Sequence, residues 1–401
     1  MIRNRSLLAL TTAELISQLG SAFSGLALPW FVLVTTHSTS RMGLVFAVEL
    51  IPFVLFGLHA GLVVDRLGPR TTMLLSDLVR APVIAIVPFL HAVGGLSYGI
   101  VLAVAFVSGL FSTAYFSCQR ALIPEIVGTS ETNISRGNTL LEGATNFTNF
   151  AGPAIAGVLI AFIGATNVMW VDAGSFLASF VLVGMSVRVV RQVHTKEEAG
   201  GLLAGLAYIA KDRFVRRAVL SPFLYGAAFP LVFASFPVLA YRDYHHNPRV
   251  AGLLLAAYGG GSVIGSFATY GALARFKSVS IAVVAAVLIG APFWLLVPHV
   301  PLAVFVVAMA VIGFANPMIN GPYFGILTKR VPPALFPKVL QAIIVANQVI
   351  RPAAYALAGF LFASIGLHTV YAFAAVVASL ASLNFIFAVT SDQGTGAQEA
   401  T

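Results

Sequence analysis

Long apolar runs separated by short polar breaks occupy nearly all of this 401-residue chain. Each run is long enough for a transmembrane helix, which needs about 20 mostly apolar residues. The runs are continuously apolar rather than alternating, and this pattern excludes the strands of a membrane barrel. The predicted spans are 7–35, 43–64, 72–92, 96–118, 139–164, 167–188, 217–241, 250–273, 279–298, 303–327, 338–365 and 367–390. The pattern therefore predicts an all-α polytopic membrane protein with twelve transmembrane helices.

The longest polar interruption, residues 189–216, divides the twelve spans into two sets of six. We expect an N-terminal six-helix bundle over 1–188, a cytoplasmic linker over 189–216 that contains a short amphipathic helix, a C-terminal six-helix bundle over 217–390, and a disordered cytoplasmic tail over 391–401. Residues 157–164 match 359–366 at five of eight positions, and 43–47 resemble 252–256. Both matches occur at nearly the same offset, so the halves are predicted to be parallel repeats related by an axis along the membrane normal.

Charged residues make up 9% of the chain, whereas a soluble domain carries about 25%. The net charge is +9, which could indicate nucleic-acid binding. However, most of the 23 Lys and Arg residues lie in breaks on one side of the predicted membrane. The positive-inside rule then places both termini in the cytoplasm, in a cell-membrane protein with no nucleic-acid partner. The single cysteine, Cys118, excludes an internal disulfide.

An unusual group of charges occupies the break after the second span, where the sequence reads GLVVDRLGPR. Its residues Gly61, Asp65, Arg66, Gly68 and Arg70 resemble the G-x-L-A-D-R-x-G-R-K signature of the major facilitator superfamily. The segments 28–30 (LPW), 121–125 (ALIPE) and 172–176 (DAGSF) resemble its macrolide-efflux and enterobactin-exporter group, which contains proton-coupled exporters. The match is incomplete, because valines replace the usual Leu and Ala at 63 and 64, and proline stands at 69, where a basic residue is common.

The resemblance implies the fold of two six-helix bundles and a cytoplasmic latch between them. In the family, span 2 packs against span 11. A helix N-terminus favours a nearby carboxylate, so Asp65 is expected to cap the start of span 11 while Arg66 or Arg70 pairs with Glu125. Gly61 and Gly68 belong to the same predicted latch. The alternative is that these charges only anchor a loop in water.

Several charged residues fall inside the predicted spans, where a charge costs about 2.5–3.5 kcal/mol. Asp77 and Arg80 are expected to form a structural pair one helical turn apart. The candidates for proton coupling are Glu49, Glu14, Arg351, Asp172 and Glu142. A Glu49–Arg351 bridge between spans 2 and 11 would open when Glu49 is protonated. The alternatives are a static pair, or two groups at membrane depths too different for them to meet. Asp172 could instead cap a helix, and Glu142 could lie at the membrane interface.

Polar residues in spans 5 and 11 each follow one helical face, which predicts a shared central cavity. Hydrogen bonding between helices is the alternative explanation. Aromatic residues from other spans are expected to join this cavity. The predicted cavity residues are Trp30, Phe23, Tyr115, Asn146, Asn149, Phe229, Phe233, Asn316, Asn320, Tyr323, Gln341, Gln348 and Tyr355.

The sequence contains no nucleotide-binding P-loop, so the energy for transport is expected to come from protons or Na⁺. We predict a monomeric, proton-coupled exporter of a large amphipathic organic molecule, such as a drug or siderophore, without metal or cofactor. Residues 146–157 partly resemble an antiporter motif, which favours export. An uptake symporter for a small organic solute is the alternative. A membrane enzyme is the competing class, but the histidines in the spans have no carboxylate or cysteine partner nearby in the sequence.

Overall fold

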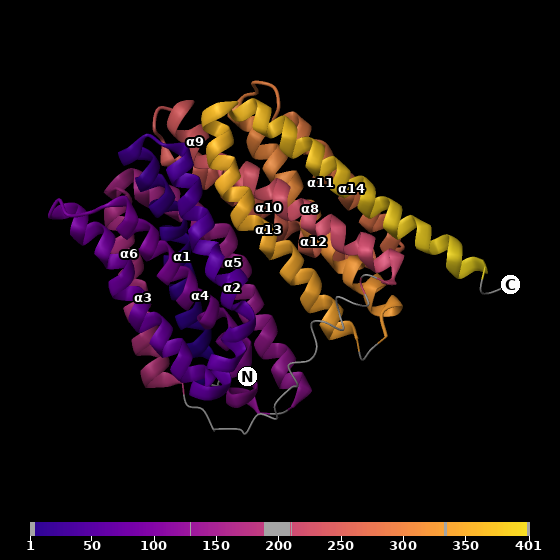
Figure 1. Ribbon diagram of the computed structural model, residues 1–401. Coiled ribbons are helices and arrows are strands. Elements are labelled where there is room, and N and C mark those ends of the chain that lie inside the picture. Colours follow the sequence, from indigo (N-terminus) through magenta and orange to yellow (C-terminus); the bar gives the residue numbers. More distant parts are fainter. Residues whose placement is uncertain (1–4, 129, 188–208, 210, 333–334, 399–401) are drawn as a thin grey trace. The chain divides into compact units, whose positions relative to one another are not determined.

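The computed structural model describes residues 5–128, 130–187, 209, 211–332 and 335–398, and at some positions inside helices it describes the backbone alone. Within these residues, twelve helical segments are long and apolar enough to cross a membrane, as predicted, and two consecutive helices together form the seventh of them, Val215–Arg242. The helices are α1 (Arg5–Thr36), α2 (Thr39–Leu67), α3 (Pro69–Ala92), α4 (Tyr98–Val127), α5 (Glu131–Ile163), α6 (Ala165–Ser186), α8 (Arg213–Phe233), α9 (Ser235–Arg242), α10 (Pro248–Leu273), α11 (Ser278–Leu295), α12 (Leu302–Arg330), α13 (Phe336–Ser364) and α14 (Leu367–Gln398) (Figure 1).

The seventh span is interrupted, because α8 ends at Phe233 and α9 begins at Ser235. Pro237 explains the break. It has no N–H to donate to the carbonyl of Phe233, and a proline ring clashes with the carbonyl four residues earlier. Prolines elsewhere, such as Pro230, remain inside a continuous helix, as transmembrane helices often allow.

Gly68 makes the turn between α2 and α3 possible. Its φ of 81° lies in the left-handed region, which residues with a Cβ rarely adopt. Its N–H donates to the carbonyl of Val64 (2.8 Å), and its own carbonyl accepts from the N–H of Thr72 (3.0 Å). Pro69 then starts α3 at a position where no N–H is needed. One glycine therefore ends one span and begins the next.

The chain forms two compact units, residues 1–196 with 237–256, and residues 197–236 with 257–401. In the first unit, α1 packs on α5 and α6, α2 on α4, and α3 on α4 and α6. In the second, α8 packs on α13 and α14, and α11 on α12 and α14. These are equivalent pairs when α1–α6 are matched in order to α8 and α10–α14. Both units therefore repeat one packing scheme, as the sequence matches predicted.

The repeat extends to two close helix crossings. A Cβ on Gly109 of α4 would lie 2.0 Å from the carbonyl oxygen of Glu49 on α2. A Cβ on Gly313 of α12 would lie 1.9 Å from the carbonyl oxygen of Tyr258 on α10. Small residues allow transmembrane helices to approach this closely. The crossings also identify Tyr258 as the counterpart of Glu49.

Two predicted boundaries differ from the structure. Residues 237–256 cluster with the first unit instead of staying within the bundle predicted over 217–390, because Pro237 breaks the seventh span and Gly252 of α10 packs closely on Gly157 of α5. The last helix, α14, continues to Gln398, whereas the tail was predicted to begin at residue 391 (Figure 1). Extending an existing helix needs no new nucleus. The predicted linker helix lies outside the described residues.

Candidate functional site

The charged segment at the start of α3 binds the end of α6. Nη2 of Arg70 donates to the carbonyl oxygen of Gly184 at 2.6 Å. Gly184 lies in the last turn of α6, where carbonyls have no partner within the helix and cations are favourable. Arg66 is exposed, and Glu125 is buried. The side chain of Asp65 and the surroundings of Gly61 lie outside the described part of the chain, so the latch stays a prediction.

Arg80 is the centre of a buried polar group within the first unit. Its Nη2 donates to Oγ of Ser21 on α1 at 2.6 Å. Its guanidinium carbon lies 3.9 Å from the ring centroid of Phe176 on α6 and 5.7 Å from that of Tyr115 on α4. Residues from four helices therefore meet in the interior. Within the described residues, Nε of Arg80 and the hydroxyl of Tyr115 have no hydrogen-bond partner.

Three carboxyl groups interact electrostatically with Arg80. They belong to Glu49 of α2, Asp77 of α3 and Asp172 of α6. Asp77 is fully buried, and its Oδ1 accepts from Oγ of Ser17 on α1 at 3.3 Å. Its Oδ2 has no hydrogen-bond partner in the described part of the chain. One guanidinium thus faces three acids, so it cannot neutralise all of them at once.

Glu14 lies beside this group in a second polar environment. Its Oε1 accepts from the side-chain amides of Gln18 and of Gln119 on α4, and Gln18 also donates to Oγ1 of Thr145 on α5 (3.3 Å). Glu14 is 1% exposed, and its Oε2 has no partner among the described atoms. The Asp77 carboxyl is close enough to repel a charge on Glu14. The two polar environments are therefore electrostatically linked.

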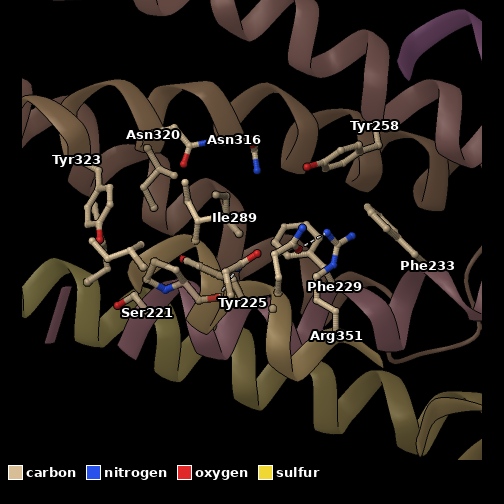
Figure 2. A pocket seen from close by; sticks show the side chains of 18 residues that line it. Ser221, Tyr225, Phe229, Phe233, Tyr258, Ile289, Asn316, Asn320, Tyr323 and Arg351 are labelled. Atoms are coloured by element: carbon tan, nitrogen blue, oxygen red, sulfur yellow. Dashed lines mark hydrogen bonds between the residues drawn. The ribbon is translucent and has the colours of Figure 1, made fainter. Parts of the chain in front are cut away.

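The second unit contains a cavity of about 430 Å³, within the range of small-molecule sites. Helices α8, α10, α11, α12, α13 and α14 all contribute to its wall. The lining residues are Ser221, Pro222, Tyr225, Gly226, Phe229, Phe233, Tyr258, Ile289, Asn316, Ile319, Asn320, Tyr323, Ile343, Ile344, Asn347, Gln348, Arg351 and Phe385. In Figure 2, Arg351 extends from α13 into the space that Tyr258 and the asparagines of α12 also face.

Aromatic rings form one wall of this cavity. The ring of Phe229 lies 6.0 Å from the rings of Tyr225 and Tyr258 and 5.6 Å from that of Phe233, measured between centroids. These distances lie within the range of favourable ring contacts. Side-chain amides supply hydrogen-bonding groups elsewhere. Nδ2 of Asn347, for example, donates to the carbonyl of Pro222 at 2.7 Å and joins α13 to α8.

Comparison with known proteins agrees with this architecture. The profile of the Major Facilitator Superfamily matches residues 10–355. The chain belongs to this superfamily. It is 27% identical to the multidrug efflux pump Tap of Mycolicibacterium fortuitum over 376 residues, which are 91% of each protein. It is also 27% identical to Tap of Mycobacterium tuberculosis over 369 residues, which are 90% of this chain and 87% of the relative.

A solved structure confirms the fold of the superfamily. A bacterial homologue of the iron transporter ferroportin, in its inward-facing state, matches with a TM-score of 0.75 at 14% identity and covers 96% of this chain and 98% of its own. This superfamily member is therefore a multi-pass membrane transporter of the drug-efflux group, and not an enzyme. Among the described residues, no group of three His, Cys, Asp or Glu side chains could hold a metal ion.

The structure brings together six of the predicted cavity residues of this transporter. Those lining the cavity of the second unit are Phe229, Phe233, Asn316, Asn320, Tyr323 and Gln348. Three of the others, Phe23, Trp30 and Tyr115, are buried in the first unit. Two more, Asn146 and Asn149, are exposed on α5. Tyr355 is buried in α13 but is not among the residues that line the cavity. The side chain of Gln341 lies outside the described part. Sequence reasoning missed Tyr258 and Asn347, although Tyr258 occupies the repeat position of Glu49.

The charged candidates are also distributed differently from expectation. Asp172 does not cap a helix end; it is buried in α6, where its Oδ1 would lie 2.4 Å from a Cβ on Gly20 of α1. Asp77 interacts electrostatically with Arg80, its expected partner, but it shares that arginine with Glu49 and Asp172. Glu142 is exposed. Arg351 donates to Gln348 Oε1 at 2.8 Å; its predicted bridge to Glu49, in the other unit, stays a prediction.

Proposed function

We propose that this chain is a proton-coupled exporter of amphipathic organic molecules. It works as an antiporter by alternating access, with both termini in the cytoplasm. The sharing of Arg80 among the carboxyl groups of Glu49, Asp77 and Asp172, of which the last two are buried, carries the proposal. An uncompensated charge is expensive inside a membrane, so each change in how these groups pair with Arg80 favours uptake or release of a proton. The names of the Tap relatives support export as the direction.

Glu14 is the proposed proton carrier, and Asp77 links it to Arg80. When the transporter opens to water on one side, Oε2 of Glu14, which has no hydrogen-bond partner among the described atoms, gains access to protons. When the transporter closes on that side, a charged Glu14 is repelled by the like charge of Asp77. Protonation of Glu14 is therefore coupled to the conformational state. Glu49 and Asp172 also interact with Arg80. They therefore influence how strongly Arg80 can stabilise the charge on Asp77.

The predicted latch completes the proposal on the cytoplasmic side. Asp65 would cap the first turn of α13 when the cytoplasmic face is closed, and the dipole of that helix would favour the carboxylate. The Gly68 turn and the hydrogen bond from Arg70 to Gly184 support this role, because they fix the end of α2 and the start of α3 against α6.

The test is transport by the purified full-length protein in proteoliposomes with an imposed pH gradient. A panel of anionic, neutral and cationic aromatic compounds is supplied. An exporter moves a compound against the proton flow, whereas substrate accumulation in the same direction as protons identifies an uptake symporter and overturns the proposal.

Residue roles are tested with Glu14→Gln, Glu49→Gln and Asp77→Asn, and with Asp243→Asn in an exposed loop as the matched control. We expect Glu14→Gln to lose transport driven by the gradient while it retains exchange of substrate for substrate. Full gradient-driven transport by Glu14→Gln would remove that residue from the coupling step, and the same result for Glu49→Gln would remove Glu49.

A further inference from the structure

The charges inside the two units differ sharply. The sequence contains no Asp or Glu from 213 to 242 or from 244 to 391, so α8 and the helices from α10 to α13 lack any carboxyl group. Arg351 is nevertheless placed in this region, and of the described residues that line the cavity it is the only one that carries a charge. The second unit itself therefore supplies a cation to the cavity and no carboxylate to neutralise it.

Arg351 has donors available for a ligand. A guanidinium carries five N–H donors in a planar fork that matches a carboxylate. The structure gives Arg351 one hydrogen bond among the described residues, from Nη1 to Oε1 of Gln348. Tyr258 interacts with Arg351 electrostatically and presents a hydroxyl to the same space (Figure 2). Gln348 orients the guanidinium of Arg351. The remaining N–H groups of this guanidinium and the hydroxyl of Tyr258 can donate hydrogen bonds to an acidic group.

The rest of the cavity suits the body of an aromatic compound. Phe229 is surrounded by Tyr225, Phe233 and Tyr258, so a ligand ring beside Arg351 meets aromatic faces and edges. At the α12 wall, Nδ2 of Asn320 donates to Oδ1 of Asn316 at 3.1 Å, which leaves further amide donors and acceptors for polar substituents.

We propose that this cavity binds an aromatic organic anion, with its carboxylate or equivalent acidic group on Arg351 and Tyr258 and its ring against Phe229. This substrate class rests on the proposed export function and deepens it. Arg351 determines specificity, because a neutral analogue leaves the guanidinium without a counter-charge and a cationic analogue is repelled by it. The acids of the first unit then serve proton exchange rather than the recognition of this ligand.

The test measures binding and needs neither transport nor a gradient, so it is independent of the proposed direction and coupling. The probes are radiolabelled 2-naphthoate, 2-naphthamide and 2-naphthylmethylammonium, which share one ring system and differ in charge. Equilibrium dialysis is run against the full-length protein in phosphatidylcholine nanodiscs, with empty nanodiscs subtracted. The proteins are the wild type, Arg351→Gln, Arg351→Lys, and Arg275→Gln, which replaces an exposed arginine in the turn after α10.

We expect the wild type to bind naphthoate about tenfold or more tightly than naphthamide, because hydrogen bonds between charged groups are stronger than neutral ones. Arg351→Gln should abolish this preference, Arg351→Lys should keep part of it, and Arg275→Gln should keep all of it. Partial retention of the naphthoate preference by Arg351→Lys shows that the protein still folds when residue 351 is changed. Equal binding of the amide or the amine to the wild type, or an unchanged preference in Arg351→Gln, overturns the proposal.

A lipid phosphate is the other source of an anion at this depth. The dialysis is therefore repeated in nanodiscs that contain phosphatidylglycerol. Naphthoate affinity that is unchanged by the anionic lipid supports a soluble organic anion. A fall in affinity of tenfold or more in the wild type, absent from Arg351→Gln, assigns the site to lipid and overturns the proposal.

Discussion

The guanidinium of Arg80 lies against the ring of Phe176, 3.9 Å from its centroid, while it also donates to Ser21. The arginine thus joins α1, α3 and α6 through one side chain. A planar guanidinium stacks on a ring and donates from its edge at the same time, whereas a lysine ammonium is a point charge that cannot reproduce both contacts.

Arg80→Gln should destabilise the protein, because it removes the cation that three carboxyls share. Loss of one partner of a buried pair costs on the order of 3 kcal/mol. Adding Asp77→Asn should recover part of that loss, since one uncompensated carboxyl is removed with it. Thermal unfolding of both single variants and the double variant in detergent measures this coupling. Additive effects would show that Asp77 and Arg80 do not interact.

Gly109→Ala and Gly313→Ala should both destabilise the protein by about 1–3 kcal/mol, the usual cost of overpacking. Each new Cβ would fall about 2 Å from a carbonyl oxygen on the neighbouring helix, that of Glu49 or that of Tyr258. Gly174→Ala in α6 is the matched control, because a Cβ there meets no atom within 4 Å. Unfolding temperatures of the two variants equal to that of the control would contradict the close crossings.

Pro237→Ala should join α8 and α9 into one helix, because residue 237 would then have an N–H to donate to the carbonyl of Phe233. Hydrogen–deuterium exchange measured by mass spectrometry should show slower exchange across residues 234–238. Pro230→Ala provides the control, since Pro230 already lies within continuous α8. Unchanged exchange in Pro237→Ala would mean that something other than the proline ends α8.

The charge distribution predicts which loops face the cytoplasm. In a Cys118→Ala background, Arg275→Cys should react with a membrane-impermeant maleimide in everted vesicles only, and Asp243→Cys should react in intact cells only. Cys118 is the only native cysteine, so its replacement by alanine leaves the introduced cysteine as the single thiol. The opposite labelling pattern would reverse the proposed topology, because the positive-inside rule then fails for this chain.

The spans could be predicted from the sequence because a bilayer requires a helix wherever about 20 apolar residues occur together. The break near Ala234 shows the limit of that rule: 217–241 reads as one apolar run, and the single proline that divides it was not weighed. The cavity was predicted only in part, because residue type alone does not decide which side chains come together. Phe229 and Asn316 have aromatic or amide side chains that suit a cavity wall, but Trp30 and Tyr115 are equally suitable by residue type. Only the packing of the helices decides which of them line the cavity.

The sequence by itself determined the class of protein, the number of spans, the repeat and the expected side of each loop, because these depend on local hydropathy and charge. Only the tertiary structure decided the partners of each charged side chain. It placed Asp77, Glu49 and Asp172 in electrostatic contact with Arg80, and it placed Arg351 in an aromatic cavity whose described lining residues include no carboxylate. Apart from Asp77 and Arg80, which lie one helical turn apart, these groupings bring together residues far apart in the chain, so helix packing creates them and sequence spacing does not reveal them.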